Sequence, residues 1–72
     1  MTDSEKKIMQ HFRQYHVGAN EMLFFNSGLA TAHSTTFQLA MASLIRNGLV
    51  TKERRRNAYS LTDEGYVASM SA

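Results

Sequence analysis

The sequence predicts a mainly α-helical domain that carries one small β-hairpin. Apolar residues recur at helical spacing in several segments up to residue 46. The period then shortens toward two in residues 49–61, which is typical of strands. The chain has 72 residues, so we expect a single domain over residues 1–72.

Composition limits what kind of protein this is. With 43% hydrophobic and 19% charged residues, the chain resembles an ordinary folded domain. It contains no cysteine, which excludes disulfides and thiolate metal sites and fits a reducing cytoplasm. We find no membrane span or signal-peptide core and expect a cytoplasmic protein. A core this small gives a net folding stability of ~3–5 kcal/mol. A partner subunit would add to it, so we expect a homodimer.

The first helix is predicted over residues 3–16. Thr2 and Glu5 have the spacing of a capping box. Gly18 is the expected C-terminal cap. The apolar stripe of this helix consists of Ile8, Met9, Phe12 and Tyr15.

A short second helix is predicted after an N-cap at Asn20. The apolar run Met22–Phe25 is assigned to it and to the core. Residues 26–28, Asn-Ser-Gly, have the chemistry of a turn. Residues 29–33 are left open between this turn and the next helix.

The third helix begins after a cap at Ser34 or Thr31 and runs to Arg46, where Asn47 and Gly48 end it. Its opposite face is mostly polar and includes Ser43, with Leu39 as an apolar exception. Its expected buried stripe consists of Phe37, Ala40, Met41 and Leu44.

Two short strands, residues 49–53 and 58–61, follow and form the hairpin. Asn57 is suited to the positive φ that such loops often need. Thr62 then caps a last helix from Asp63 to about Met70.

The positive charge of the chain is local. The formal net charge is only +2. Between Arg46 and Arg56 the only acidic residue is Glu53, and the basic residues there are Arg46, Lys52, Arg54, Arg55 and Arg56. A basic patch of this kind is the electrostatic signature of nucleic-acid binding.

The order of these elements and two short motifs resemble winged helix-turn-helix regulators of the MarR and PadR kind. The first motif is the run from Leu44 to Val50, with Gly48 and Leu49 in it, and the second is Leu61-Thr62-x-x-Gly65. A basic hairpin lies between the two, and the close match covers residues 44–65. The resemblance implies a three-helix core, a two-stranded wing and a short C-terminal helix.

The resemblance also implies duplex DNA as the partner and a role in transcription regulation. In such proteins the third helix, here about residues 34–46, enters the major groove, while the wing, residues 52–57, contacts the backbone or minor groove. Three arginines on phosphates imply a salt slope of about −2 to −3. The expected DNA-binding residues are Ser34, Thr35, Thr36, Gln38, Arg46, Lys52, Arg54, Arg55, Arg56 and Asn57.

The spacing departs from the family between Leu29 and Phe37, where this chain has about three residues more than the common helix-turn-helix. This makes His33 and Ser34 weaker candidates than Thr35, Thr36 and Gln38. The face also lacks Lys and Arg before Arg46.

Other residues favour structural roles. His11, His16 and His33 are interpreted as surface histidines rather than metal ligands, since no carboxylate completes a coordination shell. The core-filling methionines are expected to be Met9, Met22, Met41 and Met70. No nucleophile with a neighbouring base, phosphate-cradling glycine loop or paired carboxylates is present, so we expect no enzyme, no cofactor and no metal.

Several alternatives stay open. Tyr66, Val67 and Met70 either cover the domain's own core or form a dimer seam. Tyr59 either packs across the hairpin or contacts phosphate. A protein-docking module is a second functional hypothesis, based on Leu39 in a nearly neutral helix face. RNA is a third partner, because the same basic patch would serve it.

Overall fold

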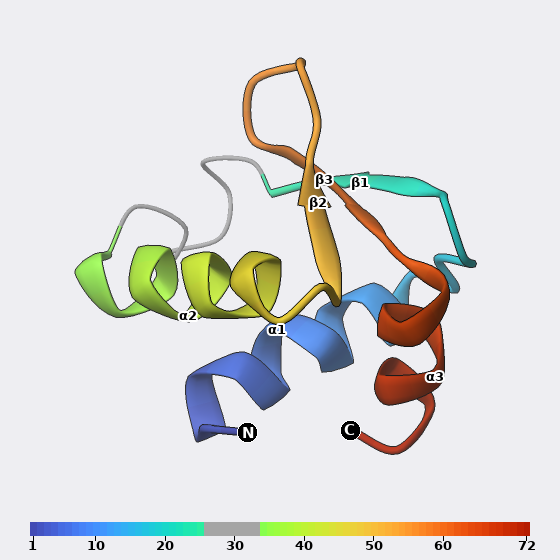
Figure 1. Cartoon of the computed structure of the whole chain (residues 1–72), viewed down its shortest axis with the longest axis horizontal. Coiled ribbons are helices and arrows are strands. Elements are labelled where there is room, and N and C mark those ends of the chain that lie inside the picture. The colour runs from blue at the N-terminus through green and yellow to red at the C-terminus, as the bar shows by residue number, and fades with distance from the viewer. Residues whose placement is uncertain (26–33) are drawn as a thin grey trace.

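Three helices and a three-stranded antiparallel sheet make up the described part of the chain, as Figure 1 shows. The computed structural model describes residues 1–25 and 34–72. The elements are α1 (Asp3–Gln14), β1 (Met22–Phe24), α2 (Thr35–Arg46), β2 (Val50–Lys52), β3 (Ala58–Leu61) and α3 (Asp63–Met70).

The predicted capping box at the start of α1 is confirmed. Thr2 Oγ1 accepts from the backbone N–H of Glu5, and Glu5 Oε1 accepts from the backbone N–H of Thr2 at 2.8 Å. The end of the helix differs from the prediction. It stops at Gln14, and the left-handed residue that follows is His16, at φ 56°, rather than Gly18. The chain therefore turns two residues earlier than expected.

The predicted helix over residues 20–25 is wrong. Met22–Phe24 form β1, and Asn20 lies in a turn at φ 65° instead of capping a helix. The exposure of the run alternates. Met22 and Phe24 are exposed, whereas Leu23 is half-buried and Phe25 is buried. This alternation is that of a strand. Thr31 and the predicted turn at 26–28 lie outside the described residues.

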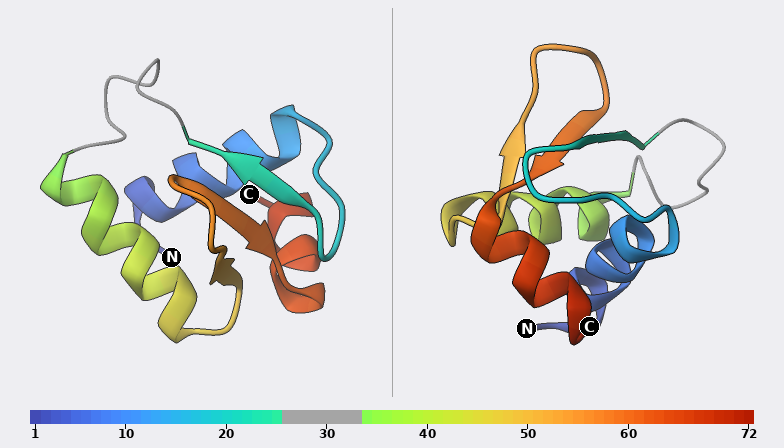
Figure 2. Two further views of the ribbon diagram at one scale, coloured as in Figure 1. Left: turned by 90° about the horizontal axis from the view of Figure 1, so that it is seen from above. Right: turned by 90° about the vertical axis from the view of Figure 1, so that its right-hand side faces the viewer.

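The sheet has the order β1-β3-β2, so β3 is its central strand. Both neighbours pair antiparallel to it, with Leu23 opposite Tyr59 in one ladder and Lys52 opposite Tyr59 in the other. The predicted hairpin is thus confirmed, and β1 adds a third strand that the sequence analysis missed. The right-hand view of Figure 2 shows the β2–β3 hairpin extending away from the helices.

The core lies where α1, α2 and the sheet meet. The predicted stripe of α2 is confirmed, since Ala40, Met41 and Leu44 are buried and Phe37 is half-buried. Phe25 joins the layers, because its ring lies against the rings of Phe12, Phe37, Tyr59 and His11 at centroid distances of 5.1 to 5.7 Å. These contacts hold β1 and the start of α2 against α1.

Two of the four methionines assigned to the core lie outside it. Met9 and Met41 are buried, as predicted. Met22 is 41% exposed because its position in β1 points away from the helices, and Met70 is 54% exposed on α3.

The two sequence motifs, residues 44–50 and 61–65, meet in space. We call their contact the junction; it is formed by Gly48, Leu49, Thr62 and Gly65. Thr62 Oγ1 donates to the Gly48 carbonyl oxygen at 2.6 Å, and Thr62 N–H donates to the Leu49 carbonyl oxygen at 3.1 Å. Gly48 has φ 76°, the conformation expected of it. A Cβ on Gly65 would lie 1.8 Å from the Leu49 oxygen, so only glycine fits there.

No helix in the described ranges, 1–25 and 34–72, combines the length and apolar character required to cross a membrane.

Candidate nucleic-acid interface

Helix α2 presents one face to solvent because the other face is fixed in the core. Ser34, one of the two predicted caps, is the N-cap, and its Oγ accepts from the backbone N–H of Phe37 at 3.0 Å. At 100° per residue, the buried stripe dictates the outer face. The exposed residues of α2 are Thr35, Thr36, Gln38, Leu39, Ala42, Ile45 and Arg46.

The two flanks of this face have different neighbours. On one flank Ser43 Oγ donates to Glu5 Oε2 at 3.0 Å, so that flank lies against α1. This contact removes Ser43 from the solvent face to which the sequence analysis assigned it. Thr36 is on the same flank as Ser43, because residues seven positions apart share a helix face. Gln38 is about 200° around the helix from Thr36, so it is on the opposite flank. Thr35, Gln38 and Arg46 are therefore open to a partner that does not meet α1.

The arginines of the hairpin lie in its loop, at the end farthest from the helices (Figure 1). The loop spans residues 53–57 between β2 and β3, and Arg54, Arg55 and Arg56 are all exposed. Asn57 has φ 59°, as its residue type predicted. We call Arg54–Arg56 the wing tip.

Lys52 and Asn57 lie below the wing tip. Lys52 Nζ donates to the carbonyl oxygens of Glu53 (2.8 Å) and Arg55 (3.1 Å), and it lies 5.2 Å from the centre of the Tyr59 ring. The Asn57 carbonyl oxygen accepts from the backbone N–H of Phe25 at 2.7 Å. Both residues therefore hold the loop in place, a role that the sequence analysis gave to Asn57 but not to Lys52.

Glu53, the only acid in the basic segment, is also engaged. It is half-buried, and its Oε2 accepts from Ser60 Oγ at 2.6 Å. This carboxylate is thus held where β2 passes into the loop, next to the three arginines. Its position on one side of the loop, with Ser60 on the other, was the signal that the sequence offered for this contact.

The β2–β3 hairpin and α1 lie on different sides of α2. In Figure 1 the hairpin rises from the end of α2, while α1 lies on the other side of that helix. The arrangement brings together two elements that the sequence analysis assigned to one partner.

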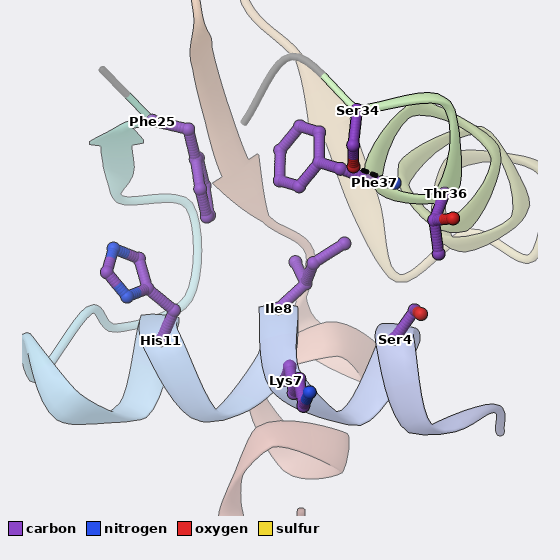
Figure 3. Close-up of a pocket in the computed structure, with 8 residues that line it drawn as sticks. All are labelled: Ser4, Lys7, Ile8, His11, Phe25, Ser34, Thr36 and Phe37. Atoms are coloured by element: carbon purple, nitrogen blue, oxygen red, sulfur yellow. Dashed lines mark hydrogen bonds between the residues drawn. The ribbon is translucent and has the colours of Figure 1, made fainter. Parts of the chain in front are cut away.

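A pocket of about 340 Å³ lies between α1 and the start of α2 (Figure 3). The rings of Phe25 and Phe37 and the side chain of Ile8 give it apolar walls. His11 also lines it, half-buried rather than on the surface as predicted, and burial lowers the pKa of its imidazole. The imidazole packs between the rings of Tyr15 and Phe25.

The metal hypothesis gains no support in the described residues, which contain no group of three His, Cys, Asp or Glu side chains that could hold an ion. His16 is exposed, and His33 lies outside the described residues. Tyr59 packs across the hairpin against Lys52 and Phe25, the first of its two predicted roles.

No protein-family model, curated protein or solved structure matches this chain. The described helices and sheet are compatible with a winged helix, and a function has to be argued from the residues themselves.

Proposed function

We propose that this chain is a winged helix-turn-helix protein that binds duplex DNA and regulates transcription by occupying its site. Helix α2 enters the major groove, and the wing tip contacts the flanking backbone or minor groove. In this proposal the chain carries out no chemical step. The observation that carries it is that three exposed arginines lie at the tip of the hairpin that directly follows α2, a helix whose exposed face is largely polar.

The chemistry of the two elements fits different parts of a duplex. A major groove ~12 Å wide admits a helix. Gln38 has the amide that pairs bidentately with adenine, and the Thr35 methyl group suits a thymine methyl. The arginines of the wing tip donate to phosphate oxygens in a fork geometry. Thus α2 supplies base contacts and the wing supplies most of the affinity.

The test is a titration with duplex DNA at several salt concentrations. Each phosphate contact contributes ~0.9 to the slope of log affinity against log salt, so replacing Arg54, Arg55 and Arg56 by Ala lowers the slope by ~2–3. An affinity that ignores salt, or that survives the triple replacement, would overturn the proposal.

A matched control separates site from net charge. Arg54→Ala with Arg55→Ala and Lys6→Ala with Lys7→Ala remove the same charge, from the wing tip and from α1. We expect the first pair to lower the slope by ~2 and the second to leave it nearly unchanged. Equal effects would mean that general charge, not the wing, attracts DNA.

Leu39 favours a second candidate, a protein-docking module. It is 68% exposed in the middle of the α2 face. Chemical-shift mapping distinguishes the two functions. Perturbations at Thr35–Gln38 and the wing tip support DNA, whereas perturbations centred on Leu39 and α3 support a protein partner. Competition between RNA and duplex DNA for the wing tip decides between the nucleic acids.

A further inference from the structure

Helix α3 carries an uncovered apolar strip on its outer side. Asp63, Tyr66, Val67 and Met70 follow the i, i+3, i+4, i+7 spacing that places residues on one helix face. Val67 is 69% exposed and Met70 is 54% exposed, and Tyr66 is also exposed. We call these four residues the α3 strip. Val67 and Met70 leave large apolar surface in water.

The strip cannot turn into the domain's own core. Gly65 and Ser69, on the other side of α3, are buried, and the junction leaves no space for a Cβ at Gly65. Ser69 Oγ also donates to the Tyr66 carbonyl oxygen at 2.7 Å. Because the inner face of α3 is fixed in this way, the α3 strip stays outside. The helix itself lies nearest the viewer in the right-hand view of Figure 2.

The two ends of the strip have opposite charge. Asp63 is in the first turn and is exposed. At the other end Arg13, from α1, donates through Nη1 to the Met70 carbonyl oxygen at 3.0 Å. The order along the strip is therefore acidic, apolar, basic.

Such an order is self-complementary about a two-fold axis. When two α3 helices pack antiparallel, Val67 and Met70 of each copy meet those of the other, and each Asp63 lies near the Arg13 of the other copy. A two-fold interface requires a surface that matches itself in this way. We propose that a second copy of this chain covers the α3 strip, in an antiparallel α3–α3 dimer.

The size of α3 sets the strength of this dimer. Eight residues make a helix of ~12 Å, and a pair this short buries less than the ~1,200 Å² of standard interfaces. The dimer therefore forms in the micromolar range and weakens with salt. The wing tip lies away from α3 (Figure 1), so both copies keep it free.

The apolar part of the seam is tested by sedimentation equilibrium over a wide range of protein concentration, without DNA. Val67→Glu places two buried charges in the seam and raises the dissociation constant at least ~30-fold. Leu39→Glu is the matched control, since Leu39 is 68% exposed and lies on α2. It leaves the constant unchanged. A chain that stays monomeric at millimolar concentration, or a dimer that Val67→Glu does not weaken, overturns the proposal.

The charged ends allow a test that depends on the antiparallel arrangement. Asp63→Lys and Arg13→Glu each place like charges together in a homodimer, and we expect each to weaken association several-fold. An equimolar mixture of the two variants restores opposite charges at both ends, so it associates more tightly than either variant alone. Circular dichroism checks that each variant is folded. If the mixture associates no better than the separate variants, the antiparallel arrangement is wrong.

This dimer does not depend on DNA binding. Sedimentation is measured on the protein alone, and the salt titration is interpreted from its slope, so either proposal can fail while the other stands.

Discussion

The junction and the wing tip lie at opposite ends of the β2–β3 hairpin and are built in opposite ways. At the junction, Thr62 donates two hydrogen bonds across to Gly48 and Leu49, and Gly65 leaves no room for a side chain. At the wing tip three guanidinium groups are exposed, and the loop is held by hydrogen bonds from Lys52 to its carbonyl oxygens. Substitutions at the junction should therefore change stability, and substitutions at the wing tip should change binding.

The largest expected effect is that of Gly65→Ala. The new Cβ would meet the Leu49 oxygen at 1.8 Å, so α3 has to move away from the junction. Overpacking of this severity destabilises by about 3 kcal/mol, which is most of the stability expected of a chain this size. Urea unfolding followed by circular dichroism measures the loss.

Gly18→Ala is the control for that substitution. The nearest atom to its new Cβ is the Glu21 carboxylate oxygen at 2.9 Å, at the end of a flexible side chain. We expect a loss below ~1 kcal/mol. Equal losses in the two variants would show that the junction is no tighter than an ordinary loop.

An intermediate loss of folding stability is expected at acidic pH, because the start of α1 depends on the Glu5 carboxylate. Its hydrogen bonds to Thr2, and the weaker one to Ser43, hold the pKa of this carboxyl below 4.5. A lowered carboxyl pKa contributes stability above the unfolded value of about 4.5, and this contribution is lost as the pH falls through the folded pKa. Glu5→Gln removes this dependence, at ~1 kcal/mol for the weakened cap.

His11 acts in the same direction at higher pH. Burial lowers the pKa of its imidazole below 6.5, so the folded state binds the proton less well than the unfolded state. Stability therefore falls as the pH drops below about 6.5. Urea midpoints between about pH 7 and pH 3 separate the two groups. A Glu5→Gln profile parallel to that of the parent chain below pH 4.5 would contradict the role assigned to Glu5.

The smallest effect on stability is expected at Lys52. Lys52→Met removes the two hydrogen bonds to loop carbonyls and leaves the exposed arginines in place. We expect less than ~1 kcal/mol of destabilisation. Under the proposed function, DNA affinity falls about threefold while the salt slope stays the same, because Lys52 orders the loop and contacts no phosphate.

Arg55→Ala is the comparison for Lys52→Met. It leaves the loop carbonyls bonded and lowers the salt slope by ~0.9. If the salt slope falls by the same amount in both variants, Lys52 contacts phosphate as the arginines do. The two substitutions thus divide the wing into residues that hold it and residues that bind.

Where local signals decide the structure, the sequence was sufficient. Thr2 with Glu5, Ser34 and Thr62 cap their helices as predicted, and Gly48 and Asn57 have positive φ. Each of these features depends on the residue itself and on neighbours within a few positions. The hairpin and the exposure of its arginines followed from the same kind of signal.

Where distant contacts decide, the sequence was misleading. Met22–Phe24 form a strand only because β3, more than thirty residues later, pairs with them. A run of four apolar residues has no period from which a helix and a strand can be told apart. The role of Lys52 was hidden for a related reason, since a lysine at the end of a strand gives no sign that its side chain bonds back to the loop carbonyls.

The central position of β3 has a consequence for the lifetimes of the backbone amide protons. Its two edges are occupied by β1 and β2, and it continues through Thr62 into α3. The β3 amides that are hydrogen-bonded to β1 and β2 should exchange with deuterium only when the whole domain unfolds. Their exchange rate is therefore set by the free energy of global unfolding. Those of the arginine loop should exchange far sooner, so one spectrum would record both the most and the least persistent parts of the hairpin.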